Sequence, residues 1–437
     1  MIKSAMKSHL TQDQLAKYEE FQQFAKAKVE PFAAEWDHAQ QIPGDALSCL
    51  GRAGYLGACI PADFGGQGWD TMTFGLLNEA LGRSDSAFTG VVTVQSMVSM
   101  SLLKWGTDAQ RQKWLPPLAK GEMYGAFALT EPDTGSDLQS LTTAYHRDDG
   151  KDGLVLSGEK KWITCGQFAD VFLVFGKLDQ KPLACLVPKD SDGLKIEPIR
   201  DLMGFRAAGL ARLHFSNVAV PADNIIGKPG FAFSHVAPVG LQYGRISTAC
   251  SALGLLRGCF EESTAYAASR KIGEKRVGDL GMIQSLIARM GADLEAARLL
   301  CWSACRAEDA SHRHVLFGLP WKRAHQQSEH DRDVAGGEED GRQSTCGKYR
   351  AVARRHEQRR SDSGWQGEGW HVDRGHRRVE RGQRAAGLRT RRRARLGRER
   401  QAPADPAGRA ATAAASTQPK SRVRCAAAVL NGSSISA

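Results

Sequence analysis

The stretch FALTEPDTGSD, Phe127 to Asp137, is the most informative part of this 437-residue sequence. An apolar run that is typical of a strand passes into a turn made by Pro132 and Gly135, and the hydroxyl of Ser136 follows. Such a turn offers backbone N–H groups and small hydroxyls to the polar edge of a ligand. An ordinary polar surface turn is the alternative interpretation.

A second stretch, KKWITCG at residues 160–166, follows closely. Trp162 and Thr164 occupy alternate positions, so on a strand both side chains would face the same side. A large aromatic face beside a hydroxyl donor suits a flat heterocycle such as a flavin. Taken singly, Trp162 could equally be a core residue, so the prediction depends on the combination of the two stretches.

Outward from these stretches the sequence divides into blocks. Residues 1–125 show helical spacing, residues 126–238 hold short apolar runs bounded by turn residues, and helical spacing returns over residues 239–310. The sequence therefore predicts an α+β multi-domain fold: an N-terminal helical domain, a middle β-barrel-like domain, and the start of a C-terminal helical bundle that is incomplete. The helical seam expected in the third block consists of Ile283, Ile287, Met290, Leu294, Ala297 and Cys301.

The last block, residues 311–437, differs in composition from everything before it. From Trp321 to Ala437 the sequence has 23 Arg, 3 Lys and 13 acidic residues, a net charge of +13, whereas the preceding 320 residues carry a net charge of −2. The same 117 residues contain no Phe and only ten Leu, Ile and Val together. That is too little apolar surface to offset an ordering entropy of roughly 1–2 kcal/mol per residue. This Arg-rich tail is therefore expected to be disordered, and it accounts for the basic character of the whole chain.

The remaining bulk properties predict a cytoplasmic protein. The ten cysteines are scattered without paired spacing, which favours reduced thiols and gives no metal site. No stretch approaches the roughly 18 apolar residues of a membrane span. The N-terminus, Met1 to Ser4, is not followed by the apolar segment of a signal peptide.

The pair of motifs L-T-E-P-x-x-G-S-D and K-x-W-I-T-x-G, at this separation inside a helical–β–helical chain, resembles the acyl-CoA dehydrogenase family. The resemblance extends over residues 1–310. Further matching segments are Gly57, Ile60-Pro61, Gly65-Gly66-Gln67-Gly68, Trp105-Gly106-Thr107, Gln110, Met203 to Gly209, Val218-Ala219-Val220-Pro221, Asn224 and Gly227.

The resemblance implies FAD as the cofactor and assigns residues to it. Thr164 is implied to place its hydroxyl near flavin N5, with Trp162 and Ile163 covering one face of the ring system. Arg270 is implied to reach the FAD phosphates across a subunit boundary, so a homo-oligomer, commonly a tetramer in the family, is expected. The full implied set is Phe127, Leu129, Thr130, Ser136, Trp162, Ile163, Thr164 and Arg270.

For the substrate, the resemblance implies contacts from Ser136, Gln242 and Arg245 to an acyl thioester, either acyl-CoA or an acyl carrier protein. The family usually has Asp where Gln242 stands, which weakens the pairing with Arg245. The implied reaction is α,β-dehydrogenation, in which a carboxylate removes the α-proton while the β-hydrogen leaves as hydride to flavin N5. Electrons would then pass to an electron-transferring flavoprotein.

Two alternatives within the same fold remain open. The segment Lys271 to Asp279 and the G-F-R-A-A run at residues 204–208 look closer to a branch that oxidises carrier-bound acyl groups for polyketide extender units. An oxidase that hands electrons to oxygen would share the same motifs.

The catalytic base is not identified. Most relatives carry a Glu in a Y-E-G-T-like segment near the C-terminus, and this sequence has no such segment and no Gly-Gly motif before it. Some relatives place the base just before the equivalent of Arg245, and Gly244 stands there.

A change of reading frame near Ser311 to Pro320 would explain both the missing base and the tail, because GC-rich DNA translated out of frame yields Arg, Ala and Gly. Translation of the other two frames tests this hypothesis. The alternative is an inactive relative whose basic tail binds nucleic acid, although the tail offers few interleaved aromatic residues.

Overall fold

The computed structural model describes residues 9–148 and 152–310. The predictions made for the Arg-rich tail lie outside the described residues. The N-terminal helices are α2 (Gln12–Lys28), α3 (Ala33–Ala39), α4 (Gly44–Arg52), α5 (Thr71–Ser84), α6 (Ser86–Trp105) and α7 (Asp108–Lys120).

Polar caps set where α2, α5, α6 and α7 begin. Thr11 and Gln14 form a capping box at the start of α2, and Thr107 with Gln110 forms another at α7. The first turn of α5 is capped twice. Asp70 accepts a hydrogen bond from Thr73 N at 2.7 Å. From the far end of the described chain, the Asp309 carboxylate accepts the backbone N–H groups of Thr71 and Met72 at 2.7 and 3.1 Å.

Helix α6 is the most apolar of the described helices. Contrary to the sequence expectation, it is long and apolar enough to cross a membrane by length and composition. However, 72% of its most apolar stretch is buried inside the protein. Its composition is therefore explained by its place in the core.

The middle of the chain forms one sheet. Its strands are β1 (Gly125–Ala128), β2 (Ala144–Arg147), β3 (Gly153–Ile163), β4 (Val171–Leu178), β5 (Lys181–Pro188), β6 (Leu194–Pro198), β7 (Ala211–Pro221) and β8 (Ile225–Ile226). Hydrogen bonds join them in the order β6-β7-β3-β2-β4-β5-β8, with β1 parallel to β4. All four residues of β1 are buried, so the segment that leads into the first motif starts deep in the core.

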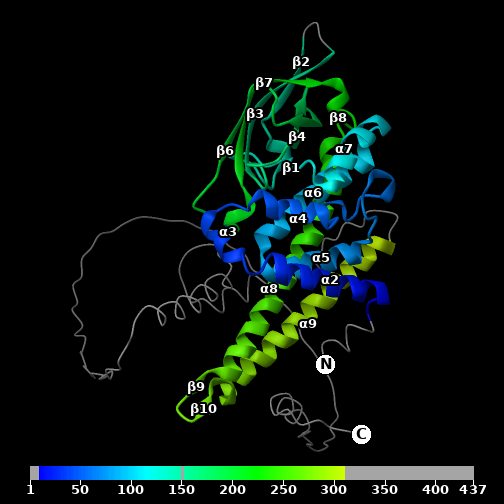
Figure 1. Ribbon diagram of the computed structural model, residues 1–437. Helices are drawn as coiled ribbons and strands as arrows, with labels where there is room; N and C mark the ends of the chain where they lie inside the picture. Colours follow the sequence, from blue (N-terminus) through cyan, green and yellow to red (C-terminus); the bar gives the residue numbers. More distant parts are fainter. Residues whose placement is uncertain (1–8, 149–151, 311–437) are drawn as a thin grey trace, which may run out of the picture. The chain divides into compact units, whose positions relative to one another are not determined.

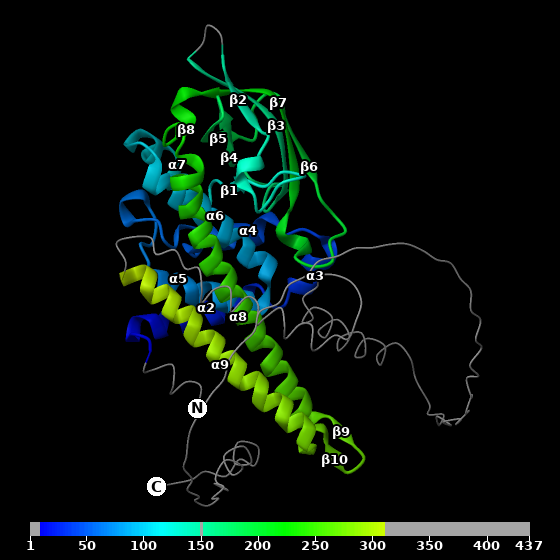
Figure 2. The same cartoon turned by 180° about the vertical axis from the view of Figure 1, so that it is seen from behind.

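Two long helices follow the sheet. Helix α8 (Ala237–Ser269) runs from the sheet to a small hairpin of β9 (Lys271–Ile272) and β10 (Lys275–Arg276), and α9 (Gly281–Ala310) returns beside it (Figures 1 and 2). At 1.5 Å per residue, the 33 residues of α8 extend over about 50 Å. The predicted order of helical, sheet and helical parts is confirmed.

The expected seam of α9 is only partly buried. Leu294 and Cys301 are fully buried, whereas Ile283 and Ile287 are half-exposed. The exposed large apolar side chains of this helix are Met282, Leu286, Leu299 and Leu300.

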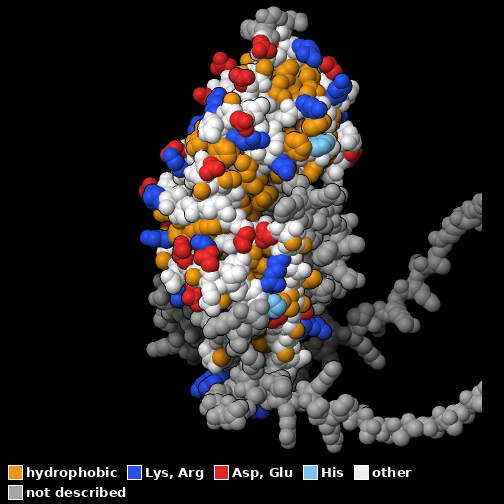
Figure 3. Space-filling view, turned by 90° about the vertical axis from the view of Figure 1, so that its right-hand side faces the viewer, with side chains coloured by type: hydrophobic (Ala, Val, Ile, Leu, Met, Phe, Trp, Pro, Cys, Tyr) orange, Lys and Arg blue, Asp and Glu red, His pale blue; other side chains and the backbone are white. Residues whose placement is uncertain are grey.

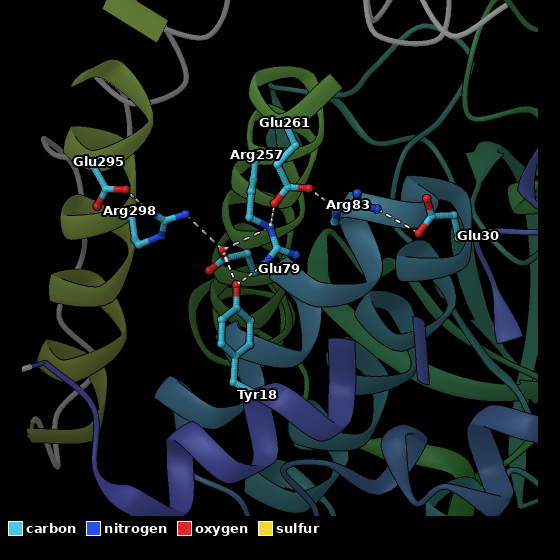
Figure 4. Close-up of polar contacts among 8 residues, drawn as sticks. All are labelled: Tyr18, Glu30, Glu79, Arg83, Arg257, Glu261, Glu295 and Arg298. Carbon is cyan, nitrogen blue, oxygen red and sulfur yellow. Dashed lines mark hydrogen bonds and ion pairs between the residues drawn. The ribbon is translucent and has the colours of Figure 1, made fainter. Parts of the chain in front are cut away.

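A buried polar cluster joins helices from both ends of the described chain (Figure 4). The carboxylate of Glu79, on α5, accepts the Tyr18 hydroxyl at 2.5 Å and pairs with Arg298 at 3.7 Å and Arg257 at 4.0 Å. Arg257 also donates to the Tyr18 hydroxyl at 2.8 Å. Burial, together with the charge of Glu79, raises the pKa of Tyr18 well above its usual range. Helices α2, α5, α8 and α9 are therefore held together by polar as well as apolar contacts.

Candidate cofactor and substrate site

The two sequence motifs lie side by side. The backbone N–H of Lys161 donates to the Thr130 carbonyl at 2.9 Å. The Lys160 ammonium donates to the Leu129 carbonyl at 3.0 Å and to Glu131 Oε1 at 2.8 Å. The loop after β1 and the end of β3 are thereby fixed to each other.

Glu131 and Lys160 form a buried ion pair in which the side chains are 3% and 0% exposed. The carboxylate also accepts Thr142 N at 2.7 Å, Thr142 Oγ1 at 2.8 Å and Thr143 N at 2.9 Å. Burial opposes ionisation of Glu131, but the Lys160 charge and these hydrogen bonds outweigh it and lower its pKa to about 2. Burial lowers the pKa of Lys160 to about 8, against the opposing effect of the Glu131 carboxylate.

Trp162 occupies a β-bulge. Between Lys160 and Ile163, strand β3 has one residue more than its partner β7, and Trp162 has a left-handed backbone with φ of 63°. The expectation that Trp162 and Thr164 lie at alternate positions of one regular strand is therefore wrong, because the bulge breaks the alternation and β3 ends at Ile163. The bulge leaves the Trp162 side chain 46% exposed, with the Lys161 ammonium 4.8 Å from its ring centre.

Unpaired hydrogen-bond donors stand on the same two joined segments as Trp162. Across the described part of the chain, neither the backbone N–H nor the hydroxyl of Thr130 or Thr164 has a partner. Both threonines are half-buried, and Ser136 is exposed nearby in sequence. Free N–H and O–H donors beside an accessible aromatic face are the groups that an isoalloxazine ring with carbonyl and ring-nitrogen acceptors requires. The residues present therefore fit FAD.

Phe127 and Leu129, which precede Thr130 in the chain, are buried, 8% and 7% exposed. The Phe127 ring lies 4.8 Å from that of Phe175. At Gly240, on α8, a Cβ atom would come within 2.5 Å of the Phe127 ring. Glycine is thus required there, and it lets the start of α8 approach β1 closely.

The residues predicted to bind substrate lie in different surroundings. Gln242 is buried, and its amide donates to Glu308 Oε2 on α9 at 3.1 Å. Arg245 is exposed, and within the described residues it makes no hydrogen bond or ion pair. The structure therefore does not pair Gln242 with Arg245. Arg270 is also exposed, at the far end of α8 from the sheet, so one chain does not bring it to the two motifs (Figure 1).

Ligand cavities and metal clusters away from the two motifs are the other kinds of candidate site. A cavity of about 400 Å³ opens between α7, β5 and β7, and its lining contains none of the predicted site residues. No group of three or more His, Cys, Asp or Glu residues within the described ranges could hold a metal ion.

Comparison with known proteins covers most of the described region. The family descriptions "Acyl-CoA dehydrogenase, N-terminal domain", "middle domain" and "C-terminal domain" match residues 11–122, 126–218 and 234–322. The glutaryl-CoA dehydrogenase of Desulfococcus multivorans is 32% identical over 300 residues, which cover 66% of this chain and 76% of that protein. The chain belongs to the acyl-CoA dehydrogenase family.

Solved structures of acyl-CoA dehydrogenases and related enzymes have the same fold. A glutaryl-CoA dehydrogenase from Mycobacterium smegmatis in complex with FADH2 gives a TM-score of 0.70 at 29% identity, covering 76% of this chain and 86% of that one. The prolyl acyl carrier protein oxidase AnaB gives a TM-score of 0.64 at 26% identity, covering 69% of this chain and 81% of that one. Acyl-CoA dehydrogenases are FAD-dependent oxidoreductases.

Sequence reasoning assigned no role to Lys160 or Glu131, although both stand inside the acyl-CoA dehydrogenase motifs. The alternation of strand β3 indicates that Lys160 is buried. In β3 the buried positions include Leu154, Leu156 and Lys160, so the strand alternation places a lysine on the inward face. An inward lysine requires a buried partner, and the glutamate of the first motif, Glu131, is a candidate.

Proposed function

We propose that this chain binds FAD across the Thr130 loop and the Trp162 bulge and oxidises an acyl thioester between its α and β carbons. The observation that carries the proposal is the joining of the two motifs. Lys161 N–H and the Lys160 ammonium fix the loop to the strand end while the donors of Thr130 and Thr164 stay unpaired within the described residues. Family membership supports the same conclusion.

Each site residue has a specific task in this proposal. Bound FAD supplies the oxidant for the reaction. Thr130 and Thr164 donate hydrogen bonds to its polar edge, the indole of Trp162 covers a face together with Ile163, and Phe127 and Leu129 exclude water behind it. Ser136 and Arg270 are proposed to bind the phosphate-bearing part, Arg270 from a neighbouring subunit of a homotetramer. The exposure of Arg270 at the end of α8, remote from the sheet of its own chain, supports a contact across subunits.

The acyl thioester is proposed to lie against α8, with Ser136, Gln242 and Arg245 as its polar contacts. One N–H of the buried Gln242 amide is bonded to Glu308, which leaves its other N–H and its Oε1 for a ligand. Arg245 is exposed. Removal of the α-proton needs a positioned base, and the sequence offers none at Gly244 and no Y-E-G-T-like segment. We therefore expect cofactor and substrate binding from this chain, with slow chemistry.

A direct experiment is to purify the full chain, add FAD, and record its visible absorption before and after an acyl-CoA is added without oxygen. We expect a retained flavin band that bleaches slowly. The double variant Thr130→Val/Thr164→Val removes both hydroxyls at nearly constant volume and should weaken FAD binding. A chain that is folded by circular dichroism but retains no FAD would contradict the proposal.

The partners and the location belong to the same proposal. We propose an electron-transferring flavoprotein as the acceptor and the cytoplasm as the location. A carrier-protein thioester, as in polyketide extender-unit synthesis, is an alternative to acyl-CoA. The likeness to the carrier-protein oxidase AnaB supports this alternative and also an oxidase activity. Stopped-flow mixing of the reduced chain with oxygen distinguishes an oxidase, which reacts fast, from a dehydrogenase.

The nucleic-acid alternative depends on the Arg-rich tail, which lies outside the described residues. On the face seen in Figure 3, basic and acidic side chains of the described part are interspersed and form no single-sign groove. DNA binding that depends on salt and is lost on deleting residues 321–437 would support this alternative. Bleaching of a bound flavin by an acyl thioester would exclude it.

A further inference from the structure

The carbonyl oxygen of Leu129 is held from inside the protein. The Lys160 ammonium donates to it at 3.0 Å and to Glu131 Oε1 at 2.8 Å, and the lysine side chain is 0% exposed. Lysine is rarely buried unless it is paired. Here the buried ammonium bonds to the backbone of the loop that enters the proposed cofactor site.

This bond determines where the next N–H points. A trans peptide is planar, so the C=O of Leu129 and the N–H of Thr130 point in opposite directions. Because the Leu129 oxygen faces Lys160, the Thr130 N–H faces away from the ammonium. The Thr130 carbonyl in turn accepts the Lys161 N–H at 2.9 Å. Both peptide planes that flank Thr130 are therefore fixed, while its N–H and hydroxyl have no partner within residues 9–148 and 152–310.

Glu131 keeps the ammonium in place. Its carboxylate accepts three further hydrogen bonds from Thr142 and Thr143, between 2.7 and 2.9 Å, so it cannot turn away without breaking them. An ammonium has several N–H donors and can bond a carboxylate and a carbonyl at once. A methionine of similar length has no donor, and a neutral glutamine in place of Glu131 would leave the buried cation without a counter-charge.

We propose that Lys160, anchored by Glu131, is a positioning residue that presents the Thr130 N–H and hydroxyl to the polar edge of the cofactor. The inference rests on the proposed function, because it takes FAD as the ligand of those donors. Neither Lys160 nor Glu131 touches the cofactor. They act through the Leu129–Thr130 peptide.

The test compares three variants of the full chain with a matched control. Lys160→Met and Glu131→Gln each remove one charge, and the double variant removes both, which avoids an unpaired buried charge and preserves folding better than either single change. The control is Arg298→Met, which removes a cation that is equally buried and paired, but on α9 (2% exposed, 3.7 Å from Glu79). The probe is FAD alone. The readouts are its dissociation constant from flavin fluorescence, the position of the bound visible absorption band, and the thermal unfolding midpoint.

We expect FAD binding to weaken roughly tenfold to a hundredfold in Lys160→Met and in the double variant, the loss expected when a positioned hydrogen bond is misaligned. The visible band should shift in any complex that still forms. Arg298→Met should lower the unfolding midpoint and leave both the dissociation constant and the band unchanged.

Two results overturn the proposal, and they differ. If the unaltered chain is folded and takes up no FAD, the proposed function fails and the positioning role fails with it. If the unaltered chain binds FAD and the folded double variant binds it with the same affinity and the same absorption band, the positioning role alone is wrong. In that case Lys160 and Glu131 contribute only to folding.

Discussion

Gly244 stands where some family members carry the catalytic carboxylate, and the structure shows what adjoins it. A Cβ atom at this position would lie 2.9 Å from the Met97 sulfur, the flexible part of a side chain. Gly240 and Gly244 are one turn apart on the same face of α8, and Gly240 adjoins Phe127. A carboxylate at residue 244 is thus placed beside the proposed site, provided that Met97 gives way.

We predict that the double variant Met97→Ala/Gly244→Glu bleaches bound flavin with an acyl-CoA faster than the unaltered chain, by roughly the 10²–10⁴-fold that a positioned base contributes. Stopped-flow absorption measures the rate. Met97→Ala/Gly244→Gln has nearly the same shape without the base and serves as the control. Equal rates in the Glu and Gln variants would show that residue 244 does not reach the α-proton.

Glu131 makes folding sensitive to acid. Its pKa is about 2 in the folded chain against 4.5 for the free side chain, so the unfolded chain takes up the proton first. The stability that Glu131 contributes is therefore complete above about pH 4.5 and is lost as the pH falls toward 2. The shift corresponds to about 3 kcal/mol. We predict that unfolding midpoints measured between pH 2 and 5 fall less steeply in Lys160→Met/Glu131→Gln than in the unaltered chain. Parallel curves would contradict the assignment.

At this scale the two motifs are recognisable in the sequence, but the arrangement of their residues is not. Thr130 and Trp162 were found from their motifs, and the structure joins those motifs. The bulge at Trp162 was not predictable, because a bulge depends on the register with β7, which no local pattern encodes. The partner of Gln242 was missed for a similar reason, since Glu308 lies 66 residues further along the chain.

Among the secondary-structure elements, the cluster around Glu79 decides how the helices associate. Glu79 is 1% exposed and Arg298 is 2% exposed, so removing either charge unbalances a buried cluster of charges. The outer members of the cluster are linked by Arg83, which pairs with Glu30 at 2.9 Å and Glu261 at 2.7 Å (Figure 4).

We predict that Glu79→Gln lowers the free energy of unfolding by about 3–5 kcal/mol, because Arg257 and Arg298 then lose their shared carboxylate. Asp108→Asn, which breaks the ion pair between Arg111 and the largely exposed Asp108 (95% exposed), is the control and should change it by less than about 1 kcal/mol. Urea unfolding followed by circular dichroism measures both. Similar losses in the two variants would show that the buried cluster contributes no more to stability than an exposed ion pair does.

Local sequence patterns predict some features of the helices and strands and not others. The capping box of helix α2 and the burial of Tyr18 and Phe21 on its inner face depend on residues that are close in sequence, so local patterns can specify them. The strand order β6-β7-β3-β2-β4-β5-β8 was beyond prediction. Many short apolar runs have similar composition, so local patterns cannot specify which strands pair.

At the scale of the molecule, the frame-change hypothesis remains a prediction. The described helix α9 ends at Ala310 with Glu308 and Asp309 in specific contacts, and the family match ends at residue 322. We predict that one of the other two translation frames continues a helical pattern from about this point and ends in a Y-E-G-T-like segment. Translating the gene in all frames checks it, and two frames without that pattern would contradict it.

The contact between Asp309 and the first turn of α5 has a consequence for synthesis. Residues 71 and 309 are 238 positions apart, so at roughly 5–20 residues per second a ribosome needs about ten to fifty seconds to supply the second cap after the helix has been made. Over that interval α5, which is almost wholly buried in the finished protein, lacks α8 and α9 as neighbours. Its apolar side chains would then be open to holding chaperones and to proteases, and the yield of folded protein would depend on events during translation.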